Sequence, residues 1–191
     1  MSYYTQLSLF DPQGQRKYLN RVERRRFYAV ADARERQDIR LFCLLMFYTG
    51  ARISEIVKLK PSGIDFANKS VTIRTLKRRR SDVFRQIPLP DDLLIDLENF
   101  VGRVGERVSL WDFAVRSASR YIKAVMEEAG IDGVKSSALG LRHGFAVHAV
   151  RKVPITQVQK WLGHAHLQTT AIYLDVSGTE ERELAKLMWD H

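Results

Sequence analysis

The stretch of sequence that decides the fold is Trp161-Leu162-Gly163-His164-Ala165-His166-Leu167-Gln168-Thr169-Thr170-Ala171-Ile172-Tyr173. Two arginine-containing stretches precede it, Thr49-Gly50-Ala51-Arg52-Ile53-Ser54-Glu55 and Leu141-Arg142-His143-Gly144-Phe145-Ala146. In-line transfer at a phosphate diester needs a nucleophile, cations over the non-bridging oxygens and a proton donor for the departing alkoxide. Two arginines, a histidine and a tyrosine are parts of such a site, and they need neither a metal ion nor a nucleotide.

The composition favours a nucleic-acid partner. The 31 lysine and arginine residues outnumber the 22 aspartate and glutamate residues, which gives a formal net charge of +9. A surface of this charge attracts polyanions. The length of 191 residues fits one domain, and a hydrophobic content of 45% is enough for a continuous core, so we expect a folded chain.

Cysteine usage and hydropathy indicate the compartment. Cys43 is the only cysteine and lies in an apolar run, so it forms no internal disulfide and indicates a buried thiol in a reducing compartment. No apolar run approaches the roughly 18 to 20 residues that span a bilayer, and the N-terminus lacks the basic-then-apolar order of a signal peptide. We therefore expect a soluble cytoplasmic protein with no membrane partner.

Local signals predict two helices near the start of the chain. Asn20 followed by Glu23 is a capping signature for a helix over residues 21–31, which is rich in arginine. A longer helix is expected over residues 34–48, because its apolar residues recur at helical spacing. Gly50 should end this helix.

A β-hairpin is predicted next. Residues 70–76 alternate in polarity and are β-branched, and residues 83–90 return as a second extended run. The tip of the hairpin is Lys77-Arg78-Arg79-Arg80-Ser81-Asp82. A strongly basic turn is thus expected to project from a small sheet.

The remaining chain is predicted to be mostly helical. Helices are expected over residues 90–101, 111–129 and 180–189, with breaks at residues 130–133, Pro154, Gly163 and Gly178. The fold class is α+β, mainly helical, with a small antiparallel β-sheet. We expect an N-terminal tail over residues 1–19 and a single domain over residues 20–191.

Arg52 and Arg142 are the candidate phosphate ligands, since the planar fork of arginine meets two phosphate oxygens at once. Each lies at or near a helix start, where backbone N–H groups also favour an anion. A single arginine in so basic a chain would be interpreted as a solvated surface charge. The order of the whole set argues against that interpretation here.

The three stretches, in this order, resemble the catalytic domain of the tyrosine recombinases. The stretch around Arg52 is similar to the first arginine box of the family and the stretch around Arg142 to the second. Leu162-Gly163-His164, followed nine residues later by Tyr173, is similar to the third. The resemblance covers about residues 20–185 and implies a DNA strand-exchange enzyme that needs no cofactor.

The resemblance also implies roles for individual residues. Tyr173 would attack the scissile phosphate to give a 3′-phosphotyrosyl bond and a free 5′-hydroxyl, and His164 would hydrogen-bond the phosphate. Lys77 would protonate the leaving oxygen, and Glu55 would orient the arginines. A basic turn that only grips the DNA backbone is the alternative for Lys77. The expected DNA-binding residues are Arg78, Arg79, Arg80, Arg24 and Arg25.

Position 139 departs from the family pattern. The family carries a histidine, or less often a lysine or tyrosine, three residues before the second arginine, and Leu139 stands there. His143 does not replace it by spacing, because relatives commonly carry a histidine there as well. Loss of a proton acceptor would slow the chemistry by roughly 10² to 10⁴. The chain is then a weakened recombinase, a recombinase with a substitute acceptor, or a DNA-binding protein on an impaired scaffold.

Partners can also be predicted. Double-stranded DNA is the expected substrate, and the resemblance implies assembly into a dimer or tetramer on DNA. The helix expected over residues 180–189 would dock on a neighbouring subunit. The alternative is that it packs on its own domain. The short N-terminal part resembles the architecture of fimbrial phase-switch invertases. A type IB topoisomerase shares the chemistry but is disfavoured by the short chain. His164 and His166 alone predict no metal site.

The N-terminal peptide Gln6-Leu7-Ser8-Leu9-Phe10 resembles the motif that binds the bacterial sliding clamp. Gln6 would be its polar anchor, and Leu9 and Phe10 would fill an apolar groove. The alternative is that the apolar residues pack this segment onto the domain itself.

Overall fold

The structure of the protein is a computed structural model. It describes residues 8–75, 83–105 and 109–175, together with residues 182, 185, 186, 188 and 189. Several predictions lie outside the described residues: the roles of Lys77, Arg78, Arg79, Arg80 and Gln6, and the break at Gly178. Within the described part of the chain, no helix combines the length and apolar character needed to cross a membrane.

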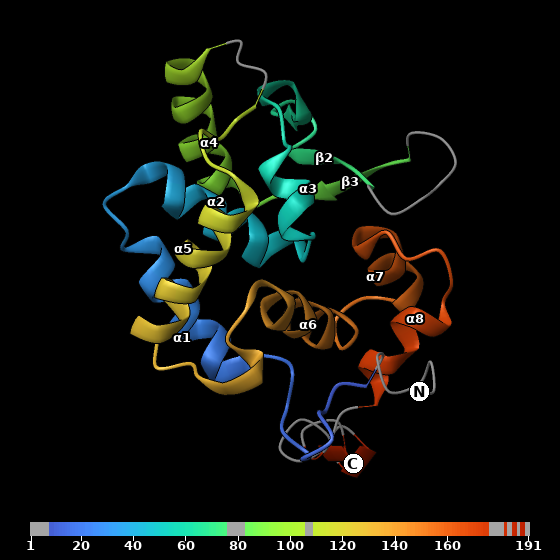
Figure 1. The fold of residues 1–191 in the computed structure, drawn as a ribbon. Helices are drawn as coiled ribbons and strands as arrows, with labels where there is room; N and C mark the ends of the chain where they lie inside the picture. Colours follow the sequence, from blue (N-terminus) through green and yellow to red (C-terminus); the bar gives the residue numbers. More distant parts are fainter. Residues whose placement is uncertain are drawn as a thin grey trace.

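The fold is mainly helical with one small sheet (Figure 1). Its elements in chain order are α1 (Arg21–Asp32), α2 (Gln37–Thr49), α3 (Ile53–Val57), η2 (Pro61–Gly63), β1 (Ile64–Asp65), β2 (Ser70–Arg74), β3 (Phe84–Pro88), α4 (Asp91–Val104), α5 (Val115–Glu128), η3 (Gly133–Lys135), α6 (Ala138–Ala149), α7 (Ile155–Leu162), α8 (Gln168–Ala171) and η4 (Ile172–Leu174). The predicted fold class is confirmed.

The predicted helix signals act as expected at the start of the chain. The side chain of Asn20 accepts a hydrogen bond from the backbone N–H of Glu23, and the Glu23 carboxylate accepts one from the N–H of Asn20. Gly50 ends α2 in the left-handed conformation at φ 58°. Arg52 is therefore the N-cap residue of α3, as predicted.

The predicted helix over residues 111–129 begins later than expected, at Val115. Trp111 is held in the core, where its indole Nε1 donates a hydrogen bond to the carbonyl of Ile56 at 2.7 Å. Its ring also stacks with the rings of Phe100 and Phe113. This tertiary packing outweighs the local helical pattern at residues 111–114.

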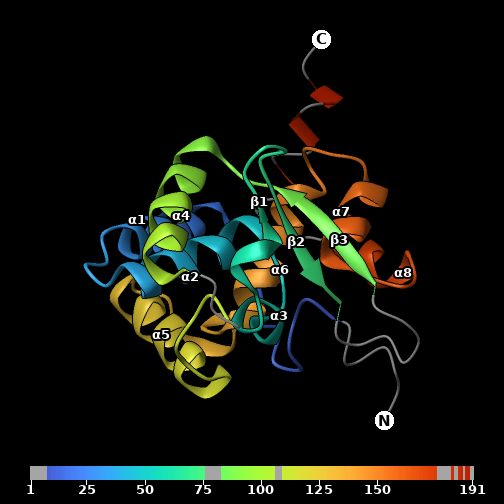
Figure 2. The same ribbon diagram turned by 90° about the horizontal axis from the view of Figure 1, so that it is seen from above.

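The predicted hairpin is present as an antiparallel pair, in which Val71 lies opposite Ile87 and Ile73 opposite Arg85. A short third strand, β1, was not predicted, and it pairs with the outer side of β2 through Ile64 and Asp65. Figure 2 shows the sheet between α7 on one side and α4 on the other. The sheet thus joins the two helical parts of the fold.

Helix α6 lies at the centre of the fold (Figure 1), and its residues pack into two separate clusters of buried apolar side chains. Leu141 belongs to the larger cluster, together with α1 and α2, while Phe145 belongs to the smaller one. Leu9 and Tyr18 are buried in the smaller cluster, so residues 8–19 pack on the domain.

Candidate active site

Arg142 lies at the centre of the candidate site and is only 4% exposed. Its Nη1 donates to the carbonyl of Gly50 at 2.7 Å, and its Nη2 donates to the carbonyl of Leu162 at 2.9 Å. These carbonyls lie at the C-terminal ends of α2 and α7, so two helix ends fix the guanidinium. Burial lowers the pKa of Arg142 to about 10, and the charge of Arg52 acts in the same direction. An anion at this point would stabilise the charge.

Arg52 is held at the N-terminus of α3 by Glu55. The Glu55 carboxylate accepts hydrogen bonds from the Arg52 backbone N–H at 2.9 Å and from its Nη1 at 3.1 Å. The side chain of Arg52 keeps 24% of its surface exposed, whereas that of Glu55 is fully buried. Burial would raise the pKa of Glu55, but hydrogen bonds and charges from Arg85 and Arg52 outweigh it and lower the pKa.

Arg85 of β3 is a member of the site that was not predicted. Its Nη2 lies 2.6 Å from Glu55 Oε2, its Nη1 donates to Thr75 Oγ1 at 2.8 Å, and its Nε donates to the carbonyl of Trp161 at 2.7 Å. The signal was present in the alternation of β3, which places Arg85 on the same buried face as Ile87. An arginine on the apolar face of a strand indicates a buried ion pair.

His164 contacts Arg142 directly, because its Nε2 lies 2.9 Å from Arg142 Nη2. An arginine can only donate, so Nε2 accepts and Nδ1 donates to Thr170 Oγ1 at 2.9 Å. Burial, followed by the charge of Arg142, lowers the pKa of His164 to about 3. The ring is therefore neutral at neutral pH, and in this arrangement its proton is on Nδ1.

Tyr173 lies on η4 and is 2% exposed. Its ring stacks against that of His164, with centroids 6.2 Å apart, and its hydroxyl lies 3.0 Å from His143 Nδ1. Burial raises the pKa of Tyr173, and the positive charges of Arg142 and Arg52 only partly oppose that shift. The hydroxyl is therefore protonated, and it needs an acceptor before it can act as a nucleophile.

His143 is one of the groups at this hydroxyl, beside Arg142. Burial lowers its pKa to about 4, with further contributions from the charges of Arg142 and Lys17, so the ring is neutral and able to accept a proton. Leu139, in the first turn of α6, is 58% exposed and has no polar atom in its side chain. Spacing alone gave His143 no such role, since the contact joins residues 30 positions apart.

The structure thus brings together the predicted residues Arg52, Glu55, Arg142, His143, His164 and Tyr173. Two predicted DNA-binding residues lie elsewhere: Arg24 is buried over the ring of Phe47 at 4.2 Å, and Arg25 is exposed on α1. Among the described residues, no group of three or more histidine, cysteine, aspartate or glutamate side chains could hold a metal ion.

Two apolar residues of the proposed clamp-binding peptide, Leu9 and Phe10, are engaged within the domain. Leu9 is 3% exposed, and the ring of Phe10 meets that of Tyr18 edge-on with centroids 6.2 Å apart. Phe10 also pairs with Arg16 in an isolated β-bridge. This arrangement agrees with the alternative in which the segment packs onto the domain, and it gives the clamp-binding hypothesis no support.

Comparison with known proteins matches most of the chain to one family. Residues 17–180 match the phage integrase family. The tyrosine recombinase XerA of Pyrococcus furiosus is 33% identical over 155 residues, which are 75% of this chain and 52% of that protein. The chain spans about half the length of such relatives.

Solved structures agree in fold. A crystal structure of XerA recombinase superposes with a TM-score of 0.77 at 25% identity, covering 91% of this chain and 65% of that one. The catalytic domain of bacteriophage HP1 integrase gives a TM-score of 0.63 at 23% identity, covering 88% of this chain and 93% of that one. The latter shows that the described fold corresponds to nearly the whole of one isolated catalytic domain.

Proposed function

Because this chain belongs to the phage integrase family, we propose that it is a tyrosine site-specific recombinase, which cleaves and rejoins double-stranded DNA through a 3′-phosphotyrosyl intermediate. One observation carries the proposal. The hydroxyl of Tyr173 lies 3.0 Å from the neutral ring of His143 and close to the positive charges of Arg52 and Arg142. The negative charge nearby does not fully balance these two arginines. This is the arrangement needed to receive a phosphate diester and attack it.

The two arginines would bind the non-bridging oxygens of the scissile phosphate. Arg142 is held rigidly by two backbone carbonyls, and Arg52 by Glu55, so neither guanidinium has to reorganise as charge develops in the transition state. Nε2 of His164 already lies at Arg142 and would hydrogen-bond the same phosphate once protonated or tautomerised. The Tyr173 oxygen then forms a bond to phosphorus while the bond to the 5′-oxygen breaks.

Proton transfer completes the step. His143 would take the proton of Tyr173, in place of the side chain that Leu139 lacks. A phosphate between the arginines would cancel part of the positive potential that lowers the pKa of His143, so DNA binding makes His143 a better base. Lys77 would give a proton to the leaving 5′-oxygen. The phosphotyrosyl bond conserves the energy of the broken bond, and a 5′-hydroxyl can reverse the reaction.

The proposed reaction would take place in the cytoplasm on paired DNA sites, with the protein assembled as a tetramer. The names of its relatives, which are tyrosine recombinases, support strand exchange. An impaired scaffold that only binds DNA is the second candidate, and Leu139 is the observation that favours it. The intact hydrogen bonds around Arg142 and His164 weigh against such decay.

The test is covalent trapping on a nicked duplex taken from the DNA that flanks the gene. Native protein should form a phosphotyrosyl adduct, and Tyr173→Phe should form none. Tyr121→Phe is the matched control, because Tyr121 lies on α5 outside the site, and it should trap DNA as the native protein does. Binding without any adduct in the native protein would favour the second candidate. Relaxation of a plasmid that lacks any recombination site would instead indicate a topoisomerase.

A further inference from the structure

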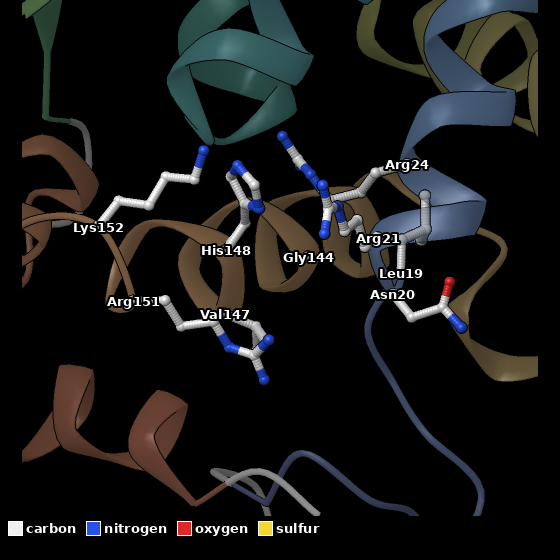
Figure 3. Close-up of a pocket in the computed structure, with 9 residues that line it drawn as sticks. All are labelled: Leu19, Asn20, Arg21, Arg24, Gly144, Val147, His148, Arg151 and Lys152. Atoms are coloured by element: carbon white, nitrogen blue, oxygen red, sulfur yellow. The ribbon is translucent and has the colours of Figure 1, made fainter. Parts of the chain in front are cut away.

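A second basic pocket lies where the start of α1 crosses α6. Figure 3 shows its lining: Arg21 and Arg24 come from α1, His148 from α6, and Arg151 and Lys152 from the turn that follows α6. The hollow measures about 230 Å³, and within the described part of the chain no aspartate or glutamate lines it. It shares no residue with the candidate active site.

Arg24 is the residue that makes this pocket unusual. It is 7% exposed, and its guanidinium stacks over the ring of Phe47 at 4.2 Å. Its Nη1 is buried and has no hydrogen-bond partner among the residues that the structure describes. A buried guanidinium with an unpaired N–H destabilises the folded protein. The ring of Phe47 covers the face of the guanidinium, while the N–H groups at its edge stay available to an acceptor. The edge of Arg24 is therefore suited to an acceptor that enters from the pocket.

The electrostatics of the neighbouring groups are consistent with an anion site. Burial lowers the pKa of Arg24 to about 10. His148 faces the same space, and burial, followed by the charges of Arg24, Lys152, Arg21 and Arg151, lowers its pKa to about 4. The shift of Arg24 reports its burial, and that of His148 reports burial together with the surrounding positive charges. A bound anion would oppose both shifts.

The pocket is also rigid on one side. Gly144 of α6 lies so close to the backbone of Leu19 that a Cβ there would come within 2.8 Å of the Leu19 carbonyl oxygen. The capping box of Asn20 and Glu23 then fixes the first turn of α1. The positions of Arg21 and Arg24 relative to His148 are thus set by close backbone packing.

We propose that this pocket binds a phosphate group, as a second anion site apart from Arg52 and Arg142. Several convergent donors and no carboxylate suit a phosphate, which offers acceptors in several directions. A phosphate of the DNA backbone, away from the scissile one, is the expected source, and in that respect the inference rests on the proposed function. Inorganic phosphate is the other source with the same chemistry.

The first arm of the test measures affinity for the unnicked flanking duplex at several salt concentrations. Each phosphate contact contributes about 0.9 to the slope of log affinity against log salt for duplex DNA. Arg24→Gln should lower the slope by about one unit. Arg26→Gln is the matched control, because it removes the same charge from an exposed position of the same helix outside the pocket lining, and its slope should stay close to native.

The second arm uses inorganic phosphate and thermal unfolding. One outcome is that phosphate raises the unfolding temperature of native protein and of Arg26→Gln but not of Arg24→Gln, while the salt dependence of DNA binding is the same in all three proteins. The pocket would then be a site for free phosphate and not for a DNA phosphate. If neither the DNA slope nor the phosphate response distinguishes Arg24→Gln from Arg26→Gln, the proposal is wrong. Should Arg24→Gln fail to fold, Lys152→Gln tests the same site at an exposed residue. Neither arm requires cleavage, so a missing Tyr173 adduct would overturn the recombinase proposal and leave this one standing.

Discussion

His143 lies within hydrogen-bond distance of Tyr173, in a site where the side chain of Leu139 has no polar atom. A neutral imidazole 3.0 Å from a protonated phenol is within the distance at which a general base works. No side-chain atom of Leu139 could do this. Under the proposed function, His143, one turn further along the same helix and next to Arg142 in the sequence, would take the place of the missing family histidine.

Replacing His143 should slow cleavage without weakening DNA binding. His143→Gln retains a polar group beside Tyr173 but cannot take a proton, so adduct formation should fall by roughly 10² to 10⁴. His166→Ala, which removes an exposed histidine, is the control and should trap DNA at the native rate. Single-turnover trapping at saturating protein measures the effect.

A second substitution separates proton transfer from loss of structure. Leu139→His restores the family residue, and in the His143→Gln background it should recover part of the lost rate. A His143→Gln variant that cleaves as fast as native protein would show that the hydroxyl loses its proton to another acceptor, such as water.

At the scale of elements, the loop between α2 and α3 positions Arg142 through Gly50. Gly50 adopts φ 58°, its carbonyl accepts the hydrogen bond from Arg142, and a Cβ there would overlap the ring of Phe145. Gly50→Ala should therefore destabilise the fold by about 2 to 4 kcal/mol, from backbone strain plus displacement of the ring. It should also slow adduct formation, since Arg142 loses a fixed partner.

Gly14 provides the matched control. It has φ 76°, and a Cβ there would meet no atom of the described residues within 4 Å, so Gly14→Ala tests backbone strain alone and should cost only about 1 kcal/mol. Urea unfolding measures both variants. Equal losses at the two positions would mean that the contact with Phe145 contributes nothing.

The ion pair of Arg85 and Glu55 ties β3 to α3. Their side chains are 3% and 0% exposed, so Arg85→Met leaves a buried carboxylate with Arg52 alone and should cost about 3 kcal/mol. Lys69→Met removes one partner of the exposed pair Lys69–Asp91 and should cost less than about 1 kcal/mol. In a cycle with Glu55→Gln, the double variant should lose less than the sum of the single losses. Additive losses would argue against direct coupling.

Sequence patterns predicted the elements whose signals are local. Asn20 with Glu23 marked the start of α1, and Gly50 marked the end of α2, because caps act within a few residues. The start of α5 was misjudged, since Trp111 is held by a carbonyl 55 positions away. The contact of His143 with Tyr173 depends in the same way on how η4 packs against α6, which no spacing reveals.

At the scale of the molecule, α6 joins the two apolar clusters and carries Arg142 between them. Leu141 is fully buried in one cluster and Ala146 in the other, so the guanidinium lies at the junction of both. Its two carbonyl partners come from helices on either side, α2 and α7. The site therefore exists only when both clusters are packed, and global stability and site geometry depend on each other.

Stability should consequently depend on pH through the buried histidines. The folded-state pKa values are about 4 for His143 and His148 and about 3 for His164. The unfolded value is about 6.5. Between these values the unfolded chain binds more protons than the native one, so the free energy of unfolding rises with pH. The histidine contribution is fully present above about pH 6.5 and is lost progressively as the pH falls towards 4.

The expected slope is up to about 1.4 kcal/mol per pH unit for each buried histidine. Glu23 and Glu55, whose pKa values are lowered against the opposing effect of burial, add to the loss only at lower pH, where carboxylates titrate. Urea unfolding between pH 7.5 and 5 isolates the histidines. His148→Gln removes one of them outside the candidate active site and should make the slope shallower than in native protein. The contrary result is a free energy of unfolding of native protein that stays constant between pH 7.5 and 5. The three histidines would then have the same pKa in the folded and unfolded states, which would contradict the effect expected from their burial beside Arg142 and Arg24.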